Sequence, residues 1–256
     1  GRAVDDALKL RPYFSDRPTM EDPLNLLGNA LRHELLDLKN MQYVLSHRMD
    51  ARAIEEGTIV AFRSWLKGFA AFVRVVLALD EETLVPWATA DAGIQAGLRR
   101  RRGEVREALE RGVKAMSIGT ASFRARLPEL RGVVDDIIAT VCGYLDAESR
   151  ALMPGLEGEG RSYEERLKVE KKMVGAVMKM CETSGSYVHL VLIYRWIHQG
   201  AYRRQWMASR IGKMAFEEEA KWKTEYWTSS YKANFDFVMG TVQEGLHDES
   251  NEFGYD

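Results

Sequence analysis

Apolar side chains recur every three or four residues along several long segments of this chain, which is the spacing of one face of an α-helix. The first stripe runs from Leu24 to Leu45 and follows Asp22-Pro23, a capping side chain with proline at the first helical position. Sustained alternation with Asn-Gly or Asp-Gly turns, which is typical of strands, does not occur in the sequence. The sequence therefore predicts an all-α fold. The long helices are expected at about 24–49, 53–84, 104–126 and 128–152.

Four helices of this length with short connections favour an antiparallel four-helix bundle. We predict three parts along the chain: an irregular N-terminal lead-in (1–23), the bundle (24–158) and a C-terminal helical, aromatic-rich extension (159–256). The extension is expected to begin with a charged amphipathic helix at 162–180 and a hydrophobic helix at 187–197. It ends in an acidic tail that contains Glu244, Asp248, Glu249, Glu252 and Asp256.

Composition excludes some classes of protein. A 256-residue chain that is 46% hydrophobic can bury a substantial core, and its formal net charge of −2 provides no global field for nucleic acid or anionic lipid. No apolar run reaches the roughly 18 residues of a membrane span. Cys142 and Cys181, the only two cysteines, are too few for a disulfide framework, although the sequence is compatible with one disulfide bond between them. We expect an intracellular reducing compartment, and an organelle if a targeting segment preceding Gly1 has been removed.

One motif occurs twice. Each of the segments 76–86 and 144–154 ends in an apolar pair and a proline, with a carboxylate, Asp80 or Glu148, six residues before that proline. Helical spacing places both carboxylates on the apolar faces of their helices, and we expect each helix to end at its proline. A buried carboxylate must be ion-paired, hydrogen-bonded or bound to a cation. Two interpretations stay open: the pair holds a metal ion, or water and a neighbouring arginine satisfy it.

These two segments resemble those of the haemerythrin-like, or HHE cation-binding, family over residues 24–158. In that family a histidine ligand stands one helical turn before each carboxylate, where this chain has Val76 and Tyr144. The resemblance implies a four-helix bundle with Asp80 and Glu148 at the positions of the bridging carboxylates. It also implies that two histidine ligands are replaced, and we expect Tyr144 to hydrogen-bond Asp80 instead of binding metal.

His33 corresponds to the first-helix ligand of that family, but its helical phase places it nearly opposite the stripe formed by Leu31, Leu35 and Leu38. The predicted third helix contains no histidine. Iron sites of this kind depend on several neutral imidazoles. We therefore expect a vestigial site and no cofactor. Bound iron or another divalent metal is expected only if the chain is a metal-binding or oxygen-sensing module. The candidate metal residues are Asp80, Glu148, Tyr144 and His33.

Four consecutive arginines, Arg99 to Arg102, precede the predicted third helix. One interpretation is a loop that binds phosphate or an acidic partner surface. The other is a solvated loop or helix start whose charge is neutralised by Glu104 and Glu107.

The extension combines basic and aromatic residues, most densely at 194–213. Such a mixture suits a protein interface, and less well nucleic acid or lipid headgroups. It equally suits a helix that packs its aromatic side chains on the bundle while its arginines pair with residues 217–219. The candidate partner-binding residues are Arg195, Trp196, Tyr202, Arg203, Arg204, Trp206, Trp222, Tyr226, Trp227 and Tyr231.

The sequence contains no Gly-rich phosphate loop, nucleophile elbow or His-Glu-x-x-His motif, so we do not expect an enzyme. The favoured function is a non-catalytic structural or interaction subunit that docks within a larger protein assembly, such as an organellar or membrane-associated complex. The alternative is a metal-binding or oxygen-sensing module. A third is a peripheral binder of nucleic acid or anionic lipid through residues 194–213.

Overall fold

The structure is a computed structural model that describes residues 6–13, 22–48, 56–117, 127–158, 162–197, 200–212 and 215–240. Every regular element in these ranges is helical, which confirms the predicted all-α class. The elements are, in chain order, α2 (Asp22–Arg48), α3 (Glu56–Leu79), the π-helical turn η1 (Asp80–Leu84), α4 (Val85–Ala88), α5 (Ala92–Met116), α7 (Leu127–Gly158), α8 (Tyr163–Ser184), α9 (Val188–Tyr194), α10 (Ala201–Arg210), α11 (Ala215–Thr228) and α12 (Ser230–Met239).

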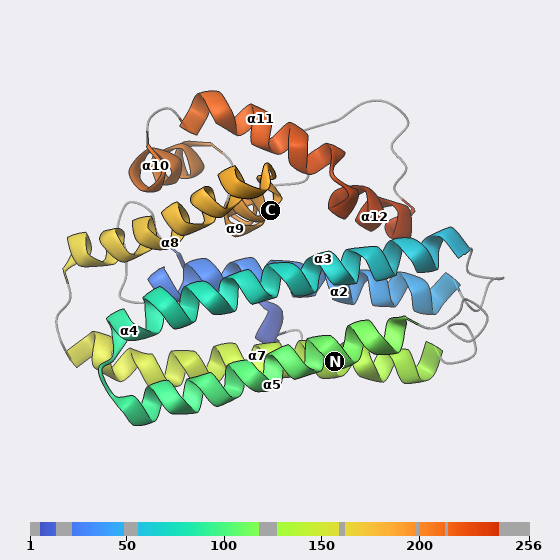
Figure 1. Cartoon of the computed structure of the whole chain (residues 1–256), viewed down its shortest axis with the longest axis horizontal. Helices are drawn as coiled ribbons and strands as arrows, with labels where there is room; N and C mark the ends of the chain where they lie inside the picture. Colours follow the sequence, from blue (N-terminus) through green and yellow to red (C-terminus); the bar gives the residue numbers. More distant parts are fainter. Residues whose placement is uncertain are drawn as a thin grey trace.

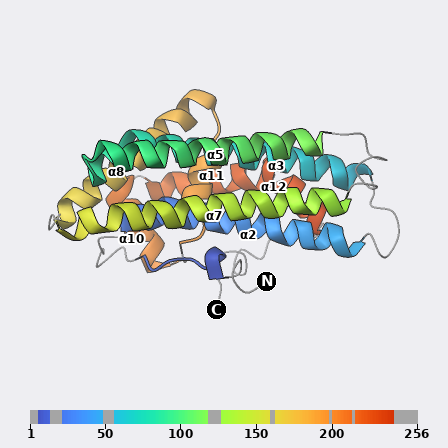
Figure 2. The ribbon, with the colours of Figure 1, turned by 90° about the horizontal axis from the view of Figure 1, so that it is seen from below.

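The helices form three layers (Figures 1 and 2). α5 packs along α7 in the first layer, and α2 and α3 form the second, with α2 against α7 and α3 against α5. The third layer, α8 to α12, covers the opposite side of α2 and α3. Buried apolar residues from all three layers belong to one continuous core. The predicted extension therefore shares its core with the long helices.

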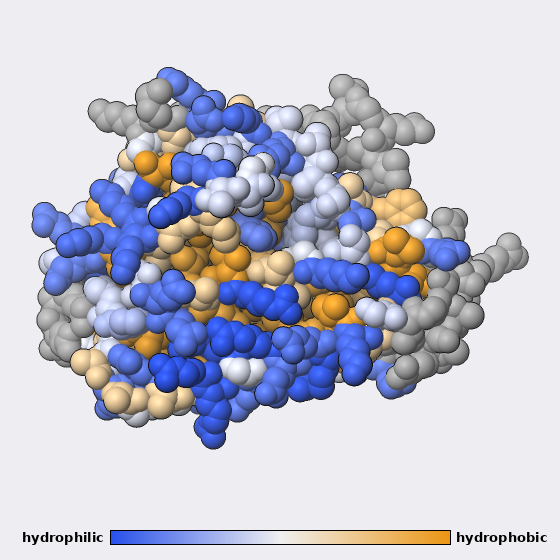
Figure 3. Space-filling model, viewed as in Figure 1, coloured by the Kyte–Doolittle hydropathy of each residue, from blue (hydrophilic) through white to orange (hydrophobic). Residues whose placement is uncertain are grey.

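The surface differs between the layers. Figure 3 shows a largely hydrophilic surface where α5 and α7 lie in Figure 1, and apolar residues between them and the third layer. Among the described helices, none is both long enough and apolar enough to cross a membrane. The acidic tail predicted beyond residue 240 lies outside the described residues, as do His198 and Lys213.

The third long helix begins earlier than predicted. α5 starts at Ala92 because the Asp91 carboxylate caps it by accepting hydrogen bonds from the backbone N–H groups of Gly93 and Ile94. The expected start near residue 104, with a loop containing Arg99 to Arg102, was wrong. Three glycines, Gly93, Gly97 and Gly103, weaken helix propensity here, but the buried side chains of this segment outweigh that cost.

Both prolines of the repeated motif lie inside helical segments, so the prediction that they end their helices was wrong. Pro86 lies in α4 directly after η1, and α7 continues through Pro154 to Gly158. Proline lacks an N–H, and its ring clashes with the carbonyl four residues earlier in an α-helix. Pro86 stands in the first turn of α4, where proline is tolerated. Beyond Pro154, the fully buried Leu156 anchors the last turn of α7 in the core.

Candidate functional site

The π-helical turn positions the first carboxylate of the repeated motif. Asp80 is the first residue of η1, and its carbonyl accepts a hydrogen bond from the N–H of Val85, five residues later. π-helical turns are rare and frequently occur at functional sites. The Asp80 side chain is only 2% exposed, so its charge requires a partner inside the protein.

Three side chains from two helices, α5 and α7, meet at or beside Asp80. Arg102 of α5 donates from Nη1 to Asp80 Oδ2 at 2.8 Å and is itself 2% exposed. Tyr144 of α7 donates its hydroxyl hydrogen to the same oxygen, as the sequence predicts. The Tyr144 hydroxyl also lies 3.2 Å from Glu148 Oε1, one helical turn further along α7. Asp80, Arg102, Tyr144 and Glu148 form what we call the Asp80 cluster.

The electrostatics of the Asp80 cluster favour one ion pair and two neutral groups. Burial raises the pKa of Glu148 well above its usual range, and the neighbouring Asp80 carboxylate raises it further. Burial likewise raises the pKa of Tyr144, with added repulsion from Glu148 and Asp80. The raised pKa values favour the neutral forms of Glu148 and Tyr144, while Arg102 pairs with Asp80.

Glu81 extends this charge pairing to the surface. Its carboxylate lies 3.1 Å from Nη2 of Arg106, 3.5 Å from Nε of Arg99 and 3.7 Å from Nε of Arg102. The hydrogen bond from Arg106 is the main cause that lowers the pKa of Glu81. The arginine run is thus divided: Arg102 points into the core, and Arg99 pairs at the surface.

The residues around Asp80 do not fit a divalent metal ion. Asp80 Oδ1 has no hydrogen-bond partner in the described part of the chain, so one ligand atom is available there. However, Oδ2 already accepts from Arg102 and Tyr144, and a metal ion beside the guanidinium would face a positive charge in a buried site. Val76, where the resemblance implies a histidine ligand, is apolar and buried. The arginine thus supplies the positive charge that a metal would otherwise bring.

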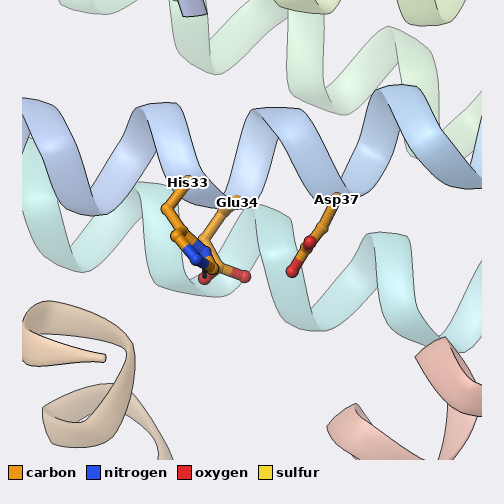
Figure 4. Close-up of side chains that lie close together, drawn as sticks. All are labelled: His33, Glu34 and Asp37. Carbon is orange, nitrogen blue, oxygen red and sulfur yellow. Dashed lines mark ion pairs between the residues drawn. The ribbon is translucent and has the colours of Figure 1, made fainter. Parts of the chain in front are cut away.

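His33 belongs to a second cluster, on the face of α2 that α9 and α12 cover. Its side chain leaves α2 on the same side as those of Glu34 and Asp37 (Figure 4), and Nδ1 lies 3.8 Å from Glu34 Oε1. Potential ligand atoms of these three buried residues lie within 4.8 Å of one another, the spacing of a metal site. Arg195, which directly follows α9, contacts both carboxylates, donating from Nε to Glu34 Oε1 at 2.7 Å and from Nη2 to Asp37.

Tyrosines complete this second cluster. Tyr231 of α12 donates to Glu34 Oε2 at 2.6 Å, and Nη1 of Arg195 lies 2.9 Å from the hydroxyl of Tyr226. Burial is the largest single influence and would raise the pKa of Glu34, but the Arg195 guanidinium and the contacts from His33 and Tyr231 together outweigh it, so the pKa is lowered. Glu34 is therefore held as a carboxylate by an arginine, and a cation at this position would compete with that arginine.

A third buried ion pair joins α8 to α10. Nε of Arg210 donates to Glu170 Oε2 at 2.7 Å, and the Tyr13 hydroxyl lies 3.1 Å from the same oxygen. The sequence interpretation missed Glu170, Arg210 and also Arg102. Apolar spacing contained the signal: Glu170 stands on the stripe of buried residues Val169, Met173, Val174 and Val177, and Arg102 on that of Leu98, Val105 and Leu109.

Most of the ten candidate partner-binding residues lie inside the protein. Tyr202 and Arg204 of α10 are exposed, and Trp227 is half-buried. The Trp206 Nε1–H donates to the Tyr13 hydroxyl at 2.7 Å, and Nε of Arg203 donates to a backbone carbonyl at 3.0 Å. The remaining seven are buried against the chain's own helices: Arg195, Trp196, Arg203, Trp206, Trp222, Tyr226 and Tyr231.

This burial favours the interpretation in which the aromatic residues of the extension pack on the long helices. Arg203 lies 3.9 Å from Glu219, one of the three acidic residues that we expected to pair with the arginines. Partner binding stays a prediction, and it now centres on Tyr202 and Arg204. Comparison of this chain with protein-family models, with curated proteins and with solved structures finds no match.

Proposed function

We propose that this chain is a non-catalytic structural or interaction subunit that docks within a larger protein assembly. Its core unit would be an antiparallel four-helix bundle of the haemerythrin-like type, made of α2, α3, α5 and α7, in which the metal ligands have been replaced. The packing of these four helices supports the bundle, and the repeated motif with Asp80 and Glu148 supports the type.

The observation that carries the proposal is the contact between Arg102 and Asp80. A metal-binding bundle leaves its inward carboxylates available for the ion. Here a buried guanidinium lies 2.8 Å from the first carboxylate, and burial raises the pKa of the second, Glu148. An interior that is neutralised by its own side chains has no electrostatic requirement for metal.

The other two charge clusters support a scaffold role. Arg195 and Arg210 lie in the segment after residue 158, and they pair with buried carboxylates of α2 and α8. Removing one partner of such a pair leaves an uncompensated buried charge, which typically costs about 3–5 kcal/mol. These pairs therefore favour one fixed arrangement of the extension, which presents Tyr202 and Arg204 at the surface.

Metal analysis tests the proposal. Purified protein should contain far less than one iron or manganese per chain, and neither EDTA nor added Fe²⁺ or Mn²⁺ should shift its melting temperature, because a ligand that binds only the native state would raise it. The matched comparison is the Asp80→Ala, Glu148→Ala double variant. Near-stoichiometric metal in the wild type that is lost in this variant would overturn the proposal and establish the metal-binding alternative.

A second experiment addresses the partner. We expect proteins that co-purify with the chain from its native cells to be lost from a Tyr202→Ala, Arg204→Ala variant and retained by Arg100→Gln, an exposed arginine on α5. Retention of every partner by the α10 variant would contradict the proposed surface. Binding to nucleic acid or anionic vesicles that weakens with salt and with Arg204→Ala would instead support the third function.

A further inference from the structure

A cleft of about 470 Å³ lies between α2 and α7, which pack side by side (Figure 2). Arg11, Arg32 and Arg150 line it. Sites that bind small molecules typically measure roughly 300–1,000 Å³ and contain a few convergent polar groups. The cleft has both properties, and neither the Asp80 cluster nor the α10 surface accounts for its three arginines.

Arg32 is the central cation of the cleft. Its side chain is only 4% exposed, yet no ion pair with a carboxylate is found for it among the described residues. Its Nε donates to the carbonyl of Ala7 at 3.2 Å, which leaves the donors on Nη1 and Nη2 for a ligand. Burial lowers the pKa of Arg32, and the nearby Arg11 lowers it further. The acidic groups of the cleft therefore do not offset the cost of burying this guanidinium beside a second one. Arginine stays protonated in proteins, and a buried cation of this kind is stabilised by an anion.

Gly28 provides the space for this guanidinium. A Cβ atom at residue 28 would lie 2.8 Å from Nη1 of Arg32, closer than carbon and nitrogen approach without a bond. Gly28 lies one helical turn before Arg32 on α2. Glycine lowers helix stability by up to about 1 kcal/mol relative to alanine, so its position here is explained by the room that it leaves for Arg32.

The other two arginines approach from different segments. The Arg11 backbone is fixed to α2, because its N–H donates to Asn29 Oδ1 at 2.7 Å and its carbonyl accepts from Asn29 Nδ2 at 2.9 Å. Nη2 of Arg11 lies 3.6 Å from Asp146 Oδ1. Arg150 of α7 donates from Nε to the carbonyl of Asp146 at 3.1 Å, so its terminal nitrogens are left for other acceptors. The chain thus holds three guanidinium groups around one space.

The balance of charge in the cleft is positive. Two acidic residues also line it, Asp146 and Glu148. Burial, followed by repulsion from Asp80, raises the pKa of Glu148 well above its usual range, which favours its neutral form. Three guanidinium groups face two carboxyl groups, so the lining carries a net positive charge in either protonation state of Glu148.

We infer that this cleft binds the phosphate group of a small phosphorylated molecule. Guanidinium groups form paired hydrogen bonds with phosphate oxygens, and the negative charge of a phosphate complements the net positive lining. Asn25 and Ser149 add polar groups, while Leu24 and Leu145 supply an apolar wall for the organic part of the ligand. This inference is independent of the proposed scaffold function, since it uses a different surface of the chain.

Calorimetric titration of the full chain tests the inference. The probes are inorganic phosphate, glycerol 3-phosphate and AMP, with glycerol and adenosine as the matched compounds without phosphate. We expect saturable binding of the phosphorylated probes, strongest for one that also fills the apolar part, and none of the controls. Vesicles that contain phosphatidic acid form a separate arm: binding to these vesicles without binding to the soluble esters would assign the phosphate to a lipid headgroup.

Two variants make the test specific. Arg32→Gln should weaken phosphate binding at least about tenfold, because hydrogen bonds to a charged group are lost. Gly28→Ala should also weaken it by displacing the guanidinium, while the melting temperature of the unliganded protein stays equal or rises because alanine favours the helix. Arg100→Gln changes an exposed residue of α5 outside the cleft and should leave binding unchanged. Absence of binding at millimolar phosphate ester, or binding that Arg32→Gln and Gly28→Ala leave intact, would overturn the inference.

Discussion

Replacing Arg102 by methionine tests whether this arginine is the charge that neutralises Asp80. The substitution keeps an unbranched side chain of similar length in the core but removes the guanidinium that lies 2.8 Å from Asp80 Oδ2. At that distance, and with an effective dielectric constant of about 20, the lost attraction is about 6 kcal/mol. The variant no longer buries a guanidinium, which offsets part of this loss. Measured costs of breaking buried pairs are about 3–5 kcal/mol.

The free energy of protonating an aspartate sets an upper limit on the stability that Arg102→Met loses through its unpaired carboxylate. Converting an aspartate with a reference pKa of about 3.9 to its neutral form costs about 4 kcal/mol at pH 7 and about 1.5 kcal/mol at pH 5. The variant cannot lose more than this through its unpaired carboxylate, because Asp80 then takes up a proton. We therefore expect Arg102→Met to lower the free energy of unfolding by about 3–4 kcal/mol at pH 7 and by about 1.5 kcal/mol at pH 5. For a chain of this size the loss at pH 7 corresponds to roughly 10 °C in melting temperature.

Urea unfolding of wild type and variant at both pH values measures this difference. Arg101→Met is the matched control, since Arg101 is exposed and its pair with Glu104, at 3.4 Å, is expected to contribute less than about 1 kcal/mol. Adding Asp80→Asn to Arg102→Met should recover part of the stability at pH 7. An equal loss at pH 5 and pH 7 would refute the electrostatic argument, because lost packing does not depend on pH in this way.

Two further predictions concern neighbouring features. The pKa of Glu148 is raised in the folded state, so its favourable contribution to stability is present below the unfolded pKa of about 4.3 and is lost as the pH rises through the folded pKa. The free energy of unfolding of Glu148→Gln relative to wild type should therefore increase from pH 4 to pH 8 in urea titrations. A constant difference between the two proteins would contradict the raised pKa. A Cβ atom at Gly68 would lie 2.6 Å from the ring of Tyr231, whereas one at Gly97 meets no atom within 4 Å. Gly68→Ala should therefore cost about 1–3 kcal/mol by calorimetric melting, and Gly97→Ala should be neutral or stabilising by up to about 1 kcal/mol; similar effects at both sites would show that α12 does not pack on α3 as described.

Periodicity was sufficient to predict that the four long helices exist and that the repeated carboxylates face inward. The start of α2 at Asp22, the burial of Asp80 and Glu148, and the hydrogen bond from Tyr144 to Asp80 agree with the sequence interpretation. Each of these follows from local chemistry, such as a capping residue or a helical phase. The same reasoning placed the start of α5 too late, because it did not weigh the burial of Leu98 and Arg102.

What only the tertiary structure decides is which charges meet. Arg102 reaches Asp80 across 22 residues of sequence, and Arg195 reaches Glu34 across 161. Helical phase shows that a residue faces inward, but not which helix stands opposite it or at what height. The sequence by itself determined an all-α chain whose inward carboxylates need partners. The packing of α5, of α10 and of the residue that follows α9 made those partners arginines, and it left Arg32 without an ion pair among the described residues.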